Sequence, residues 1–367
     1  MSLNYTGLRK LKAEDRARAS ARLLKMRERL EPLRARKREN ALLLATWNLR
    51  DFDSNKFGWG KRLPESFYYI AEIISCFDLV AIQEVTADLA PFRKLMSILG
   101  REWDYIVTDV TAGTSGNQER MAYVWNTEKV FFRKVAGEIV LPKGQLIVTE
   151  KLAETETGED LIEKVENQFA RTPFLVAFQS GWFKFNLCTV HIYFGASSGA
   201  KLQRRIREIE RLMKFFRTRQ DKENARLTSK PEQAENYILL GDFNVVSPEH
   251  ETMQALESQG FEVPDAIDGD IVRPEEGKYY DQIAVRAVDP RFRLTGGGVV
   301  NMFEDVFRNR KADRELYEPM IPAGQEPDLS LETRYKKWRT WQMSDHSPLW
   351  VEIETDFSDH YLKSLKD

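Results

Sequence analysis

From Ala41 onward the chain alternates short apolar runs with amphipathic stretches, and this alternation is the feature that most limits its fold. Runs such as ALLLATW (41–47), DLVAIQE (78–84) and YILLGDFN (237–244) are apolar almost throughout, as strands buried on both faces are. Further β-like runs cover 103–110, 120–126, 130–141, 173–179, 182–192, 279–286 and 347–354. Helical patterns lie between them irregularly, at 64–75, 89–99 and 201–216. The pattern predicts an α/β fold with two packed sheets covered by outer helices rather than one parallel sheet.

Acids, amides and histidines stand where these buried runs end. They are Asn48, Glu84, His191, Asp242, Asn244, Asp281, Asp345 and His346. A polar side chain at a buried strand end is costly unless it is paired or binds something, so a cluster of them is a candidate site. Each one alone has a plainer interpretation, such as an Asx turn in Gly-Asp-x-Asn or a hydrogen-bonded core histidine.

The first forty residues differ from the rest in charge. Of the net charge of −2, residues 1–40 carry +8, from thirteen basic and five acidic residues, and this leaves −10 for residues 41–367. Leu23, Met26, Leu30 and Leu33 recur at helical spacing between the cations, which predicts one amphipathic helix. Three partners fit that helix: the body of the protein, a nucleic acid or anionic membrane, and another protomer. The acidic body suits a site that gathers divalent cations.

Composition excludes several classes of protein. The chain is 42% hydrophobic and 31% charged over 367 residues, which excludes disorder and fibrous folds for the whole. The mean hydropathy is −0.50 and no run of about 18 apolar residues occurs, which argues against a membrane-spanning protein. The start of the chain lacks an apolar signal segment. Cys76 and Cys188 lie in apolar stretches, so we expect reduced core thiols and a cytoplasmic protein.

Six short blocks carry the polar strand ends, always in the same order along the chain. They are TWN (46–48), IQEV (82–85), VHI (190–192), GDFN (241–244), YYDQI (279–283) and SDHSP (344–348). Together they resemble the endonuclease/exonuclease/phosphatase superfamily, which has the deoxyribonuclease I-like fold. The resemblance covers about residues 41–355 and implies a four-layer α/β sandwich of two mixed β-sheets flanked by helices. We therefore expect a basic helical extension over 1–40, the superfamily domain over 41–356 and a tail over 357–367.

Two further stretches are similar to the deoxyribonuclease I branch of that superfamily. NQERMAYVW (117–125) resembles the strand whose glutamate supports the first catalytic histidine, which places Glu119 in that role. ARTPFLVAF (170–178) resembles the stretch with a phosphate-binding arginine, which places Arg171 there. Outside the resemblance, Glu119 with Arg120 fits a loop ion pair and Arg171 a solvent-facing strand start.

Phosphodiester hydrolysis needs residue types that this chain offers. A hard cation held by carboxylate and amide oxygens offsets the charge that grows on the phosphate in the transition state. Glu84, Asn48 and Asp345 suit Mg²⁺, for which Mn²⁺ is expected to substitute. The sequence has no cluster of cysteines and histidines that would indicate a zinc site instead.

Proton transfer is assigned to two carboxylate–histidine pairs, Glu119–His191 and Asp281–His346, with either histidine as the base. The nucleophile is expected to be water, because no serine or cysteine stands in an activated turn. The other polar residues contact the water, a second metal ion or the phosphate. Asp242 and Asn244 orient the water or the second metal and hydrogen-bond the phosphate, and Arg171 and Arg50 neutralise phosphate oxygens.

Contacts with the rest of a nucleic acid are less well specified. RYKKWRTW (334–341) and KFGWGKR (56–62) interleave cations with aromatic rings, which suits phosphate contacts and base stacking. The alternative for RYKKWRTW is a loop whose tryptophans pack under the domain. The basic face of the helix over 201–216 is expected to be solvated surface. Thr86 and Asn117 replace an arginine and a tyrosine that reach the DNA minor groove in the pancreatic-type enzyme.

The sequence thus predicts a Mg²⁺-dependent phosphodiesterase that acts on nucleic acid, with DNA as the expected partner. The resemblance implies an endonuclease of low sequence specificity that leaves a 5′-phosphate and a 3′-hydroxyl. One alternative is a phosphatase or phospholipase of the same fold, acting on inositol phosphates or sphingomyelin. Another is a non-catalytic module that binds nucleic acid through the basic helix.

Overall fold

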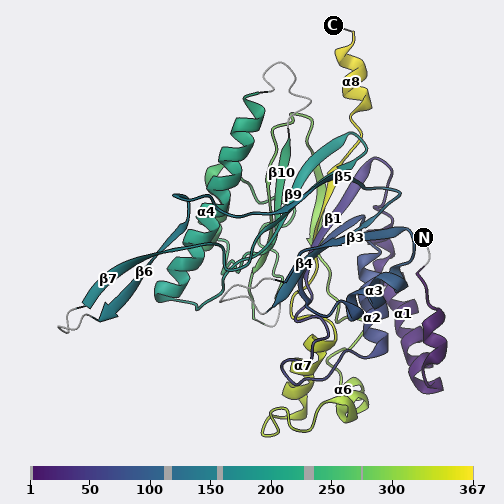
Figure 1. Ribbon diagram of the computed structural model, residues 1–367. Helices are drawn as coiled ribbons and strands as arrows, with labels where there is room; N and C mark the ends of the chain where they lie inside the picture. Colours follow the sequence, from purple (N-terminus) through teal and green to yellow (C-terminus); the bar gives the residue numbers. More distant parts are fainter. Residues whose placement is uncertain (1–2, 111–117, 155–159, 227–234, 274–275, 367) are drawn as a thin grey trace.

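The structure is a computed structural model that describes residues 3–110, 118–154, 160–226, 235–273 and 276–366. Two large β-sheets form its centre (Figure 1). The first sheet has the strand order β12-β13-β1-β2-β4-β3. Its strands are β1 (Ala41–Asn48), β2 (Leu79–Thr86), β3 (Trp103–Val107), β4 (Glu119–Asn126), β12 (Leu294–Val299) and β13 (Leu349–Glu354).

The second sheet has the strand order β11-β10-β9-β8-β5. Its strands are β5 (Phe131–Glu138), β8 (Phe174–Ser180), β9 (Phe183–His191), β10 (Asn236–Asp242) and β11 (Asp281–Arg286). β1 runs parallel to β2 and β9 runs parallel to β10, whereas the other pairs are antiparallel. Both sheets are therefore mixed, as the resemblance implies.

Strand β1 shows why the sheets form the middle layers. Leu42 and Leu44 belong to the core shared with the second sheet, whereas Leu43, Ala45 and Trp47 belong to the core shared with the helices. Successive side chains of a strand point to opposite faces, so an almost wholly apolar strand needs cover on both sides.

Helices cover the outer faces of both sheets (Figure 1). On the first sheet lie α1 (Ala13–Arg34), α2 (Pro64–Ile74) and α3 (Ala90–Leu99), and on the second lie α4 (Gly199–Asn224) and α5 (Glu251–Glu257). The four-layer α/β sandwich is thus confirmed. No helix in the described part of the chain is long and apolar enough to cross a membrane.

The secondary structure differs from the sequence prediction mainly in the polar parts of the chain. The hairpin of β6 (Ile147–Glu154) and β7 (Asp160–Asn167) extends from the body, and the sequence pattern missed it because its charged residues hide the alternation. The short helices α6 (Lys311–Tyr317) and α8 (Ser358–Ser364) were also missed. The loop interpretation of RYKKWRTW is wrong, because this stretch lies in α7 (Leu331–Gln342), where Ser330 caps the first turn by accepting from Thr333 N.

Helix α1 docks on the body through the predicted apolar stripe. Leu23, Met26 and Leu30 are buried together with Ala19, and they join the core that contains α2 and α3. Of the three partners that fitted this helix, the structure places the body against the stripe.

The cations around α1 are paired with buried carboxylates of the body. The pairs are Arg18–Glu65, Arg22–Asp313, Arg29–Asp305, Arg34–Glu72, Arg36–Glu352 and Lys37–Asp78. Each of these acids has a side chain no more than 3% exposed, so each requires a countercharge. The excess positive charge of residues 1–40 is therefore largely neutralised within the fold rather than presented to a nucleic acid.

A pair of adjacent leucines tests this docking. Leu23 is 4% exposed and Leu24 is 65% exposed. Leu23→Ala should lower the free energy of unfolding by about 2–4 kcal/mol, because it leaves a cavity between α1 and the body. The matched variant Leu24→Ala should change it by less than about 0.5 kcal/mol. Urea unfolding of both variants measures the difference, and equal effects would contradict the docked position of α1.

Candidate active site

The polar strand ends of the two sheets meet at one edge of the sandwich. β1 ends at Asn48 in the first sheet, and β10 ends at Asp242 in the second. The Asn48 side-chain Nδ2 donates to Asp242 Oδ2 over 3.1 Å and to Glu84 Oε1 over 2.9 Å. One amide therefore connects carboxylates from both sheets.

Glu84 reaches this edge through an irregularity in β2. The register between β2 and β4 shifts between Ile82 and Val85, and Glu84 between them has a φ of 60°. Such left-handed backbone is unfavourable for a residue other than glycine, and it persists where the surrounding structure holds it. Here Glu84 Oε2 accepts from Asp51 N over 2.7 Å, so the loop after β1 fixes the carboxylate.

The first carboxylate–histidine pair lies in a buried chain of contacts. Glu119 Oε2 lies 3.1 Å from His191 Nδ1, and Glu119 Oε1 accepts from Arg171 Nε. Burial, helped by the Arg171 cation, lowers the pKa of His191 to about 4. His191 is therefore neutral at pH 7, with its Nδ1 position fixed by Glu119.

In the second pair the histidine, His346, is protonated at pH 7. His346 Nδ1 contacts Asp281 Oδ2, and the His346 backbone is held by Trp47 Nε1, which donates to its carbonyl over 2.7 Å. Burial alone would lower the pKa of His346, but the Asp281 carboxylate outweighs it and raises the pKa to about 9.

Asp242 lies between the two histidines. Its Oδ2 is 3.6 Å from His191 Nε2 and 3.9 Å from His346 Nε2. Its Oδ1 accepts from Asn244 N over 2.9 Å, and Asn244 Nδ2 donates to the Ile192 carbonyl over 2.8 Å. The two imidazoles therefore present their free nitrogens to the same carboxylate.

Two arginines surround Asp345 on the other side of the cavity. Asp345 Oδ2 lies 3.4 Å from an Arg50 guanidinium nitrogen and 2.8 Å from an Arg273 one. Burial would raise the pKa of Asp345, but Arg50, His346 and Arg273 hold it below its usual range. Sequence reasoning missed Arg273, because a single arginine in an irregular stretch carries no signal.

These residues enclose a cavity of about 340 Å³. Its lining contains Arg50, Glu84, Glu119, His191, Asp242, Asn244, Asp345 and His346 from the predicted set, and also Asp51, Phe57, Phe194, Arg273, Tyr280 and Trp341. The predicted residues Asn48, Asp281 and Arg171 stand behind this lining and contact Glu84, His346 and Glu119 respectively. Eight of the predicted side chains thus meet at one cavity.

The aromatic segments proposed as grips contribute one ring each to this cavity. Trp341 lies 3.9 Å from the Arg50 guanidinium and 5.1 Å from the Phe57 ring. Trp338 is buried in the core, as the alternative for RYKKWRTW expects of its tryptophans, and Trp59 of the other segment is buried there as well. Asn117 lies outside the described residues, and the Thr86 hydroxyl donates to the Phe52 carbonyl over 3.3 Å.

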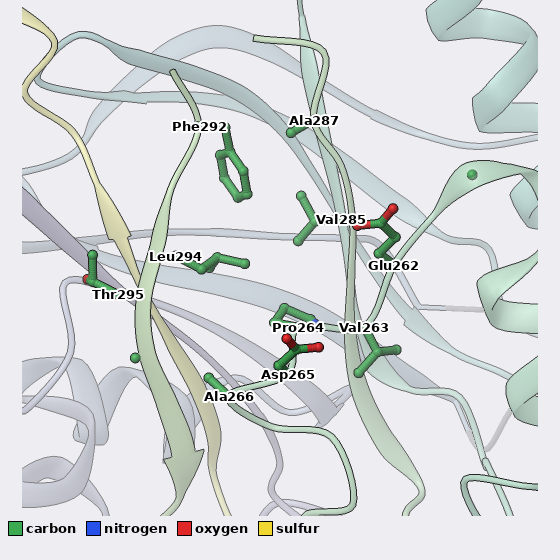
Figure 2. Close-up of a pocket in the computed structure, with 12 residues that line it drawn as sticks. Glu262, Val263, Pro264, Asp265, Ala266, Val285, Ala287, Phe292, Leu294 and Thr295 are labelled. Atoms are coloured by element: carbon green, nitrogen blue, oxygen red, sulfur yellow. The ribbon is translucent and has the colours of Figure 1, made fainter. Parts of the chain in front are cut away.

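Another cavity, of about 570 Å³, is larger but lacks this chemistry (Figure 2). It lies between β11 and β12, where Val285, Phe292 and Leu294 line it with the carboxylates Glu262 and Asp265. None of the predicted site residues lines it, and no histidine does. Size alone therefore does not single out the cavity with the predicted site residues.

One group of side chains at the smaller cavity could hold a metal ion. Ligand atoms of Glu84, Glu119 and His191 all lie within 4.8 Å of one another. Of the three predicted metal ligands, Glu84, Asn48 and Asp345, only Glu84 belongs to this group. Asn48 Oδ1 accepts from the Arg50 backbone amide, and Asp345 contacts two arginines. Carboxylate oxygens dominate the group, which fits a hard divalent cation.

Similarity to solved structures extends over most of the chain. The catalytic domain of human Nocturnin with a bound sulfate is 11% identical, with 86% of this chain and 95% of that chain covered at a TM-score of 0.50. An endonuclease/exonuclease/phosphatase family protein from Bacteroides thetaiotaomicron is 19% identical, with 86% and 98% covered at a TM-score of 0.49. D. rerio TDP2 complexed with a single-strand DNA product is 13% identical, with 86% and 99% covered at a TM-score of 0.47. No family model and no curated protein matches the chain.

The fold is therefore the one that endonuclease/exonuclease/phosphatase proteins share, the deoxyribonuclease I-like fold. The resemblance that the six sequence blocks carry is confirmed at this level. Identities this low concern the fold alone, so the function has to be argued from the residues of the cavity.

A buried glutamate near the site should make the stability of the protein depend on pH. Glu208 of α4 is fully buried and accepts from Ala170 N over 3.3 Å, next to Arg171. Burial raises the pKa of Glu208 from 4.5 to about 7. A raised folded-state pKa means that wild-type stability is full below about pH 4.5 and falls as the pH rises toward 7.

Glu208→Gln cannot ionise, so it should escape that loss. The difference in free energy of unfolding, variant minus wild type, should increase by about 2–3 kcal/mol between pH 5 and pH 8. The exposed Glu210→Gln on the same helix is the control and should show no such pH dependence. Urea unfolding at both pH values checks this, and a pH-independent difference for Glu208→Gln would contradict a raised pKa.

Proposed function

We propose that this chain is a divalent-metal-dependent phosphodiesterase that cleaves nucleic acid, as a DNA endonuclease of low sequence specificity. The observation that carries the proposal is the position of Asp242 between the Nε2 atoms of His191 and His346, at 3.6 and 3.9 Å. The two imidazoles, each in contact with its own carboxylate, point their Nε2 atoms toward the same part of the cavity, next to the carboxylate of Asp242. This arrangement supplies a base and an acid on either side of one reacting phosphorus.

The residues present fit a metal ion. Glu84, Glu119, Asp242, Asp281 and Asp345 supply five carboxylates around the site, against the guanidinium groups of Arg50, Arg171 and Arg273. Glu84 would hold the ion, together with Asn48 and Asp345 once these two exchange their present partners, which leaves Glu119 and His191 for proton transfer. Mg²⁺, with Mn²⁺ as a substitute, would supply positive charge to the phosphate oxygens in the transition state.

Water is the proposed nucleophile. Cys76 and Cys188 are free thiols but are buried, and burial raises the pKa of both. The water oxygen forms a bond to phosphorus as its proton passes to one histidine. The bond from phosphorus to the leaving oxygen breaks, and the other histidine gives that oxygen a proton. Asp242 and Asn244 orient the water and the phosphate.

The arginines divide between two tasks. Arg50 and Arg273 line the cavity beside Asp345, so we assign them to the phosphate oxygens. Arg171 is 8% exposed, and its Nε donates to Glu119. We therefore propose that Arg171 holds Glu119 against His191. Any contact of Arg171 with the phosphate would have to reach past the Glu119 carboxylate.

The aromatic lining favours nucleic acid over a small polyol phosphate. Phe57, Phe194, Tyr280 and Trp341 line the cavity, and Phe57 and Phe194 are 48% and 43% exposed. Flat rings held beside arginines offer stacking surfaces to bases, and a sugar or inositol phosphate has no comparable flat face.

The histidine variants test the chemistry. His191→Ala and His346→Ala should each lower kcat by about 10²-fold or more, with a small change in substrate affinity. His360→Ala, in the exposed helix α8, is the control and should retain wild-type turnover. Plasmid nicking with Mg²⁺, beside inositol phosphate, sphingomyelin and sugar phosphate substrates, measures this. Turnover of those substrates without nicking would favour the phosphatase or phospholipase alternative.

A phenylalanine pair tests the nucleic-acid assignment. Phe194→Ala should raise KM for a single-stranded oligonucleotide by roughly 5- to 100-fold, the range expected for one lost base stack. It should leave kcat for that oligonucleotide within about twofold, because the reacting groups are unchanged. Phe131, which is 61% exposed on β5 and far from the cavity lining, gives the control variant Phe131→Ala. An unchanged KM for Phe194→Ala would count against stacking at this position.

A further inference from the structure

One face of α4 carries a row of cations that begins beside the active-site cavity. Arg204, Arg207, Arg211 and Lys214 recur at spacings of three, four and three residues, so they share one face of the helix. From the sequence alone, this face is predicted to be solvated surface.

The β6–β7 hairpin turns this row into a groove. Figure 1 shows the hairpin passing beside α4 and extending beyond it. A cavity of about 380 Å³ lies between them, lined by Arg207, Arg211 and Lys214 of α4 and by Lys164 of β7. Arg207 donates to the Val148 carbonyl of β6 over 3.0 Å, which fixes the hairpin against the helix. Glu210 is the one acidic residue in this lining, so the groove carries a net charge of +3.

The cations of the groove lack the neutralisation seen elsewhere. Within the described part of the chain, no carboxylate lies within 4.0 Å of the charged nitrogens of Arg211 or Lys214. The last turns of the same helix differ, because Arg217 pairs with Asp221 and Arg219 pairs with Glu223. Arg211 and Lys214, beside the hairpin, therefore differ from Arg217 and Arg219, which have carboxylate partners on the same helix.

The row is continuous with the active-site cavity. Arg204 lies 4.3 Å above the Tyr193 ring, and Tyr193 lies between His191 and Phe194 in the chain. Arg205, buried on the next position of α4, donates to the Phe194 carbonyl over 3.1 Å. Phe194 lines the active-site cavity, so the first turns of α4 are attached to its rim.

We propose that the groove between α4 and the β6–β7 hairpin holds the phosphate backbone of the nucleic acid as it leaves the active-site cavity. This inference rests on the proposed function. The ten helical steps from Arg204 to Lys214 span about 15 Å, a length that a few successive phosphates of one strand cover. The cations that line this groove, Arg207, Arg211 and Lys214 of α4 with Lys164 of β7, are complementary in charge to a polyanion.

The double variant Arg211→Ala/Lys214→Ala tests the groove. Fluorescence anisotropy with a labelled single-stranded 20-mer, in EDTA to prevent cleavage, measures binding to the full chain. The variant should bind about tenfold more weakly near 100 mM salt, and its plot of log Kd against log salt should lose about 1.4 units of slope for two phosphate contacts. Lys363→Ala/Lys366→Ala, which removes two cations at the opposite end of the chain, should bind as the wild type does. The charge-conserving variant Arg211→Lys should retain most of the affinity.

Two readouts keep the outcomes apart. Hydrolysis of bis(4-nitrophenyl) phosphate should be the same in the wild type and in Arg211→Ala/Lys214→Ala, because that substrate is too small to reach the groove. If the wild type hydrolyses this diester and the double variant keeps wild-type Kd and salt slope, the groove proposal is overturned while the proposed function stands. If the wild type hydrolyses no phosphodiester, the proposed function fails. A wild type that does not bind the oligonucleotide overturns the groove proposal.

Discussion

The Asn48 amide, which donates to Glu84 in one sheet and to Asp242 in the other, is the contact on which the site depends. Because parallel strands end at the same edge, β1 with β2 and β9 with β10 bring their polar ends to one side of the sandwich. The separation of the two histidines is then set by how the sheets pack. A shift of one residue in either register would turn these side chains to the other face of their strand.

Similar cations do different things in different parts of this molecule. Around α1 they neutralise buried carboxylates such as Glu65, Asp305 and Glu352, so charge and apolar docking act together to hold that helix on the body. On α4, Arg211 and Lys214 have no carboxylate partner within the described part of the chain, and they border a groove. The net charge of a segment therefore does not indicate its role, and the position of the carboxylates around it does.

The sequence predicted the parts of the fold that depend on burial. Polar residues at the ends of apolar runs located six of the side chains that line the cavity, and helical spacing located the stripe on α1. The resemblance supplied Glu119, and Arg50 follows Asn48 by two residues in the chain. The sequence could not supply Arg273, because its role follows from the path of an irregular loop. It missed the β6–β7 hairpin, because charged residues hide the alternation there, and it missed α7, because its pattern mixes charge with aromatic residues. The contact between Arg171 and Glu119 could not be predicted either, because it depends on how β4 lies beside the segment before β8.

Anomalous scattering from crystals grown with Mn²⁺ and a short oligonucleotide tests the central claim most directly, because it locates the ion without relying on turnover. The account predicts one strong peak bonded to the Glu84 carboxylate, with an oligonucleotide phosphate beside the same ion and within reach of both histidine Nε2 atoms. A peak bound elsewhere, with no density at Glu84 and no phosphate near His191 or His346, would contradict it.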